Sequence, residues 1–120
     1  MRATHVMANL HVADIAKARE FYIDYLGLSS KGLDLGWVVR LSTPDGRASV
    51  QLVTRDATAS EDSVISVAVG RDIDQAYAEA VRRGYEIVHP LTAEQWGLRR
   101  FFVRAPDGNV INITSHSDEP

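Results

Sequence analysis

The chain has 120 residues, of which 45% are hydrophobic and 24% charged, with a formal net charge of -3. This composition suits one globular domain with its own core and excludes disordered and fibrous classes of protein. The chain has no basic cluster beyond pairs, no long apolar run and no cysteine, so we expect a cytoplasmic protein that binds neither nucleic acid nor membranes and has no disulfide or thiolate metal site.

The first elements of the chain are a strand and a helix. Residues 5–12 have the length and partial alternation of a strand. Asp14 is a favourable N-cap, and apolar residues then recur at three- and four-residue spacing, which predicts a helix over 14–26. Gly27 stands where a helix commonly ends in the left-handed conformation.

A hairpin and a linker follow this helix. Strands are predicted over 37–42 and 48–54, on either side of the turn at 44–46, whose Pro-Asp-Gly sequence is typical of turns. The polar residues 56–62 are expected to form a surface linker between unit one, 1–55, and unit two, 63–116.

The same order of elements begins again after the linker. Asp72 and Ile73 repeat Asp14 and Ile15, and a second Pro-Asp-Gly turn at 106–108 repeats the first at nearly the same spacing. One such unit cannot bury both sides of its sheet alone, so the duplication supplies the missing half of the core. The elements predicted in the second half are a strand at 63–69, a helix at 72–84, strands at 99–104 and 110–114, and a loop around His89.

Two segments carry a family resemblance. Residues 12–28, VADIAKAREFYIDYLGL, and residues 96–109, WGLRRFFVRAPDGN, resemble the glyoxalase/bleomycin resistance/dioxygenase group, the vicinal oxygen chelate superfamily. The resemblance covers nearly the whole chain, and it implies an α+β fold in which two tandem βαβββ units form a curved mixed sheet in a single domain, 1–120. It does not identify a reaction, because this fold carries many unrelated activities.

Enzymes of this superfamily bind a divalent metal ion through the first and last strands of each unit. The resemblance puts the four ligand positions at Met7, Gln51, Val64 and Asn112. This set contains no carboxylate and no imidazole, so we expect no metal ion and no other cofactor. An alternative remains: Gln51 can coordinate through its amide oxygen, and a two-residue shift of register would bring His5 or His116 to the site.

Without a metal ion, the side chains on the concave side of the sheet decide the function. A four-residue turn at 105–108 would place Phe101 opposite Asn112, with Arg99 further along the same face. This face is expected to form an apolar pocket wall with one amide and one guanidinium.

The first hairpin and one loop contribute the other expected pocket residues. One extra residue before Gln51 suggests a bulge, which would bring Trp37 and Val39 to its face. Trp96 is either a lid that stacks on a planar ligand or a core residue, and the sequence leaves both open. The expected ligand-binding residues are Met7, Trp37, Gln51, Trp96, Arg99, Phe101 and Asn112.

These residues favour a metal-free protein that sequesters a planar or aromatic small molecule, similar to the bleomycin-resistance proteins of antibiotic-resistant cells. The alternative is a glyoxalase-like lyase, isomerase or dioxygenase that depends on a divalent metal ion. A third possibility is a metal-free enzyme with His5 or His116 as general base, for which the sequence supplies no matching acid. The resemblance also implies a homodimer, in which Met7 and Gln51 would face Asn112 of the partner subunit.

Overall fold

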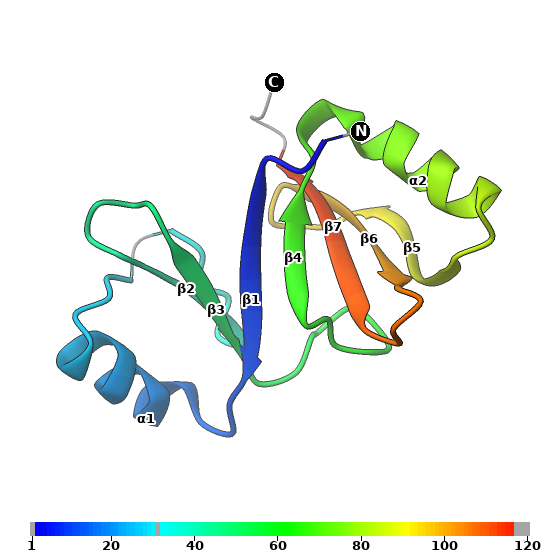
Figure 1. The fold of residues 1–120 in the computed structure, drawn as a ribbon. Coiled ribbons are helices and arrows are strands. Elements are labelled where there is room, and N and C mark those ends of the chain that lie inside the picture. The colour runs from blue at the N-terminus through cyan, green and yellow to red at the C-terminus, as the bar shows by residue number, and fades with distance from the viewer. Residues whose placement is uncertain (1, 31, 117–120) are drawn as a thin grey trace. The chain divides into compact units, whose positions relative to one another are not determined.

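The computed structural model describes residues 2–30 and 32–116, so the predicted domain limits at residues 1 and 120 lie outside it. The described residues form an α+β fold with seven strands and two α-helices (Figure 1). They divide into two compact units: the first unit is residues 7–59, and the second unit is residues 2–6 together with 60–116. None of the described helices is long and apolar enough to cross a membrane.

The sheet of the first unit has three strands in the order β2-β3-β1. β1 (His5–His11), whose first residues belong to the second unit, runs parallel to β3 (Ser49–Val53). β3 is antiparallel to β2 (Val38–Ser42) through an unbroken ladder. The βαβββ pattern predicts a further strand between the helix and this hairpin, and the described residues there form only isolated bridges, at Ser29 and Asp34.

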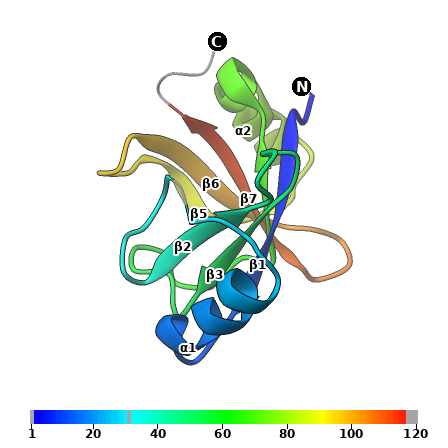
Figure 2. The same cartoon turned by 90° about the vertical axis from the view of Figure 1, so that its left-hand side faces the viewer.

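One helical segment covers one side of this sheet (Figure 2). It consists of α1 (Ile15–Arg19) and the π-helix η1 (Glu20–Tyr25), where the Leu26 N–H bonds to the Phe21 carbonyl at 3.0 Å. The predicted N-cap is confirmed, because the Asp14 carboxylate accepts a hydrogen bond from the Lys17 N–H at 3.2 Å. The core beneath this segment consists of Val39, Leu41 and Leu52, with Ile15, Ala18, Tyr22 and Ile23 packed against them.

The sheet of the second unit has four strands in the order β4-β7-β6-β5. β4 (Ile65–Ala68) is parallel to β7 (Val110–His116), and the two pairs formed with β6 (Leu98–Arg104) are antiparallel. β5 (Glu86–Ala93) was expected to be a loop around His89, and that expectation is wrong. The exposed Pro90 lies within β5, and the register of β5 with β6 shifts on both sides of His89.

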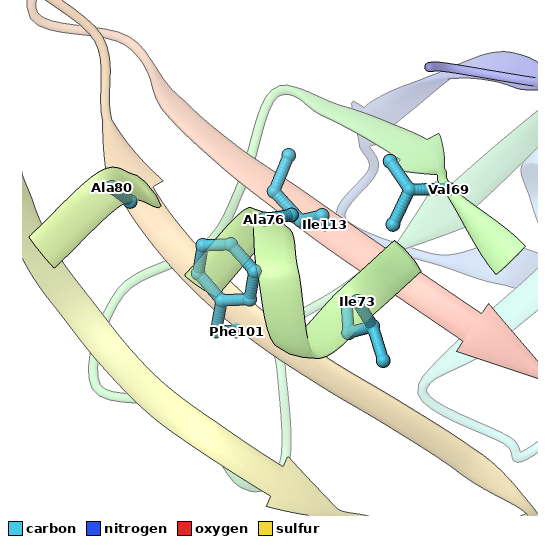
Figure 3. Close-up of a cluster of buried hydrophobic side chains, with 6 residues drawn as sticks. All are labelled: Val69, Ile73, Ala76, Ala80, Phe101 and Ile113. Atoms are coloured by element: carbon cyan, nitrogen blue, oxygen red, sulfur yellow. The ribbon is translucent and has the colours of Figure 1, made fainter. Parts of the chain in front are cut away.

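The helix α2 (Ile73–Arg82) lies on one side of the second sheet, after the short 3-10 helix η2 (Gly70–Asp72). Figure 3 shows the core between α2 and the sheet, in which Ala76 and Ala80 of α2 lie near Phe101 of β6 and Ile113 of β7. The ring of Tyr77 meets that of Phe101 edge-on, with 5.0 Å between centroids. Both sheets therefore bury one side beneath a helix, and the opposite sides carry the candidate functional residues.

Candidate functional site

The pairing of β6 with β7 decides which side chains of the second unit face away from α2. Phe102 is the partner of Asn112, and Arg100 is the partner of Thr114. The prediction that Phe101 lies opposite Asn112 is therefore wrong. The loop between the paired strands has five residues, closed by a hydrogen bond from the Ala105 N–H to the Asn109 carbonyl at 2.8 Å. This is one residue more than predicted, and a shift of one residue moves every side chain of a strand to the other face.

Two predicted pocket residues consequently lie on the helix side of the sheet. Phe101 is 1% exposed and is part of the core beneath α2. The Arg99 guanidinium pairs with the Asp74 carboxylate of α2, with Nη2 and Oδ1 2.8 Å apart. Hydrogen bonding to Arg99 lowers the pKa of Asp74, and the same bond raises the pKa of Arg99. Neither residue shares a face with Asn112.

Asn112 and Ser66 form a buried polar pair on the side opposite α2. They are partners in the parallel pairing of β4 with β7, each is 6% exposed, and Asn112 Nδ2 donates to Ser66 Oγ at 3.0 Å. Among the described residues, the buried Asn112 Oδ1 has no hydrogen-bond partner. The two ends of an amide are assigned from their hydrogen bonds, so whichever atom meets Ser66, the other is buried without a hydrogen-bond partner among the described residues. Such a buried group costs about 1–3 kcal/mol unless a water or a ligand satisfies it.

A buried ion pair lies on the same face. Arg100 Nε is 2.6 Å from Glu94 Oε2, and the side chains are 3% and 7% exposed. The guanidinium also lies over the rings of Phe102, at 4.7 Å, and Trp96, at 5.3 Å. The hairpin turn that precedes β6 brings these groups together. Gly97 in this turn has a φ of +82°, a conformation that residues with a side chain rarely adopt.

His89 and Trp96 complete this group of residues in the second unit. His89 of β5 is the partner of Phe102 of β6, and the His89 Nε2 atom lies 3.4 Å from Glu94 Oε2. Trp96 is half-buried, with its ring against Arg100. This contact ties Trp96 to the side of the sheet opposite α2, whereas its role as a lid stays a prediction.

In the first unit, a row of polar side chains crosses the sheet on the side opposite α1. Gln51 is paired with Asn9 of β1 and with Arg40 of β2, so the three side chains share one face. Gln51 is 9% exposed and Asn9 is 8% exposed. Met7 is also buried, and by alternation it lies on the same face two residues before Asn9.

The predicted bulge in the first hairpin is absent from the described ladder, and this changes the place of Val39. Val39 is the partner of Leu52, so it lies in the core beneath α1 and not beside Gln51. Trp37 lies just before β2 and is half-buried, and its carbonyl accepts a hydrogen bond from the Thr54 N–H at 3.0 Å. Without a bulge, Trp37 has the same parity as Val39, so strand pairing does not place it beside Gln51.

The residues at the four family ligand positions do not suit a divalent metal ion. Gln51 and Asn112 offer neutral amides, Met7 offers a soft thioether, and Val64 offers no donor. His5, one of the alternative ligands, is exposed, and His116 at the end of β7 is half-buried. Across residues 2–30 and 32–116, no three His, Asp or Glu side chains are grouped so that they could hold a metal ion.

Sequence reasoning missed several polar residues that share faces with Asn112 and Gln51. They are Asn9, Arg40, Ser66, His89, Glu94 and Arg100. One signal was present in the sequence: Arg40 is the lone charged residue between apolar neighbours in its strand. No local signal marks Asn9, because its partner Gln51 belongs to a strand that follows only after the helix and the first strand of the hairpin.

Comparisons with known proteins agree with this architecture. Residues 2–113 match the family model described as the Glyoxalase/Bleomycin resistance protein/Dioxygenase superfamily. No curated protein matches the chain.

Several solved structures share the fold. A protein from Legionella pneumophila, described as an NAD-dependent benzaldehyde dehydrogenase, has a TM-score of 0.73 and 16% identity, with 93% of this chain and 99% of that chain covered. Methylmalonyl-CoA epimerase from Mycobacterium tuberculosis has a TM-score of 0.73 and 19% identity, with 95% and 89% covered. A superfamily member from Vibrio splendidus 12B01 has a TM-score of 0.66 and 19% identity, with 92% and 97% covered. At these identities the likeness shows the fold alone.

Proposed function

The chain belongs to the glyoxalase/bleomycin resistance/dioxygenase superfamily, and on that basis we propose that it binds a planar or aromatic small molecule without a metal ion. The molecule is held on the sheet side opposite the helices and is sequestered without a chemical reaction. Burial of the ligand and a few placed hydrogen bonds provide the affinity, as in other small-molecule pockets.

The observation that carries this proposal is the buried amide of Asn112. One end of it binds Ser66, while the other end, although buried, has no partner among the described residues. A ligand with a hydroxyl or an amide N–H at its edge would donate to this oxygen, which recovers the cost of its burial. The buried ion pair of Arg100 with Glu94 lies on the same face.

The donor chemistry supports the metal-free form of the proposal. Amides at positions 51 and 112 can orient a ligand by hydrogen bonding, but they supply neither the negative charge nor the basicity that holds a divalent ion. Glu94, the carboxylate beside His89, already forms an ion pair with Arg100. Binding alone is therefore the simplest use of these faces.

The first test is metal content. Protein purified without chelators is expected to contain less than one metal ion per ten chains, and added nickel, zinc, manganese or iron is expected to leave its melting temperature unchanged. One tightly held ion per chain would contradict the proposal and favour a metal-dependent lyase, isomerase or dioxygenase.

The second test is a thermal-shift screen with planar phenolic and drug-like compounds, followed by Asn112→Leu. We expect a compound that raises the melting temperature of the wild-type protein and binds this variant at least tenfold more weakly, since about 1.4 kcal/mol of hydrogen bonding is lost. The matched control is Asn109→Leu, at an exposed position of the loop between β6 and β7. Equal affinity in the Asn112 variant would remove this residue from the site.

A further inference from the structure

The second unit contains a cavity on the helix side of its sheet, away from the face of Asn112. It has a volume of about 390 Å³ and lies between α2 and strands β6 and β7. Its inner wall is apolar and buried, and it consists of Ala76, Ala80, Phe101 and Ile113. This volume is typical of a small-molecule pocket, and it is many times larger than the voids of a packed protein interior.

The rim of the cavity is polar and exposed. Gln75 and Arg83 of the α2 region and Tyr85, which follows it, line the cavity and are exposed to solvent. The opening is therefore at these three residues, while the closed end lies against the sheet.

The matching helical segment of the first unit fills the corresponding space with larger side chains. Ala76 corresponds to Ala18 when Asp72 is aligned with Asp14, but the π-helix adds one residue to the first unit before Gly27, which matches Gly84, so Ala80 corresponds to Tyr22 or Ile23. Both of these side chains pack against the core of the first sheet. In the second unit the single methyl group of Ala80 stands at this place and lines the cavity beneath α2.

Arg83 is the cation that an anionic ligand would meet at the rim. It pairs there with Glu79, which also lines the cavity, and the distance from Arg83 Nε to Glu79 Oε2 is 2.5 Å. Glu79 also accepts a hydrogen bond from Arg82, which lies outside the cavity, so the three side chains together carry one net positive charge. A guanidinium has five N–H donors, so Arg83 can bind a further acceptor while it keeps Glu79.

We propose that this cavity is a second binding site, for a small amphipathic carboxylate. The aryl or alkyl body of the ligand occupies the space left by Ala80, and its carboxylate meets Arg83 at the rim. The site is separate from the one proposed at Asn112, because Phe101 and Phe102 point to opposite faces of β6.

The test uses 4-phenylbutyrate and its uncharged amide as probes, with affinity measured by titration calorimetry on the full chain. We expect the carboxylate to bind the wild-type protein about fivefold more tightly than the amide, which is the effect of one solvent-exposed ion pair. Arg83→Gln is expected to remove this preference. Arg82→Gln is the matched control, since Arg82 also binds Glu79 but does not line the cavity.

The decisive variant is Ala80→Tyr, which places an aromatic ring in the cavity. It is expected to weaken binding of both probes at least tenfold, and Ala80→Leu serves the same purpose if the tyrosine variant does not fold. Asn112→Leu is expected to leave both affinities unchanged, which separates this site from the proposed function. No binding to the wild-type protein, or undiminished binding after the cavity is filled, would show that the space is only a packing defect.

Discussion

Glu94 and Arg100 carry opposite charges and are both almost fully buried. The side chains are 7% and 3% exposed, and two aromatic rings enclose the guanidinium. Burying a charge costs desolvation free energy unless a partner of opposite charge compensates it. Removing either residue should therefore destabilise the folded state. The pair of Arg99 with Asp74 has a similarly short distance of 2.8 Å but is exposed to solvent, which screens it.

Replacing Glu94 with Gln should therefore destabilise the protein strongly. The change removes the negative charge that Glu94 places against the buried Arg100 guanidinium, and we expect a loss of about 3 kcal/mol in the free energy of unfolding. Urea denaturation followed by circular dichroism measures it. Asp74→Asn is the control, and it should have a much smaller effect. If the two variants lose the same stability, the distinction between the buried and the exposed pair is wrong.

The exposed carboxylates should instead appear in the acid response of the protein. Hydrogen bonding to Arg99 lowers the pKa of Asp74 below 3.8, and hydrogen bonding to Arg83 lowers the pKa of Glu79 below 4.5. Because the folded-state pKa is lowered, the stabilisation is complete above these ordinary values and is lost as the pH falls through the folded-state values. We expect the double variant Asp74→Asn, Glu79→Gln to lose less stability than the wild-type protein when urea titrations move from about pH 5 to pH 3. An equal loss in both proteins would contradict this assignment.

At the element scale, the sequence predicts what local chemistry decides. Asp14 as a helix cap and the glycine that ends the helix were both predictable, since each acts within a few residues. The strands of the two hairpins were also predictable, but their facing was not. That facing depends on whether the loop after β6 has four or five residues, and on whether the ladder of β2 with β3 is regular. A one-residue error in either place exchanges the core face and the pocket face of a strand. For this reason Phe101 was predicted to lie on the face of Asn112, where Phe102 lies.

The two helices offer a direct comparison of caps. The Asp14 side chain accepts a hydrogen bond at the start of α1, whereas Asp72 at the start of α2 makes no such side-chain bond. Asp14→Ala should lower the free energy of unfolding by about 1 kcal/mol. Asp72→Ala should lower it less, because only the attraction of its charge to the helix N-terminus is lost. Thermal unfolding of the two variants side by side measures the difference, and a larger loss for Asp72→Ala would be contrary to the observed caps.

At the scale of the whole molecule, the duplicated plan has been filled differently in its two copies. The first unit packs Tyr22 beneath its helical segment, and the second keeps a cavity beneath α2. Each unit also presents buried amides on the opposite side of its sheet, Gln51 in one and Asn112 in the other. Sequence repetition predicted the shared plan, but the difference in filling is visible only in the packing, where Tyr22 and Ile23 contact the first core and Ala80 lines a cavity in the second unit.

We propose that the chain forms a homodimer whose pocket needs residues of both subunits. The expected result is sedimentation as a dimer at micromolar concentration, with ligand affinity at the Asn112 site falling when dilution dissociates the dimer. Analytical ultracentrifugation and fluorescence titration over the same concentration series measure the two effects. A monomer at all concentrations, or an affinity independent of assembly, would contradict this proposal.

The irregular strand β5 has a consequence for how the protein behaves in a crowded solution. As the last strand of its sheet, it presents backbone groups to which a foreign strand could attach, and repeated attachment of that kind leads to fibrils. Pro90 removes one donor from this row, and the shifts on both sides of His89 interrupt its spacing. The Thr92 hydroxyl donates to the Pro90 carbonyl at 2.6 Å, which occupies a further group. The residues that made this segment resemble a loop in the sequence thus protect the sheet against fibril growth along this edge.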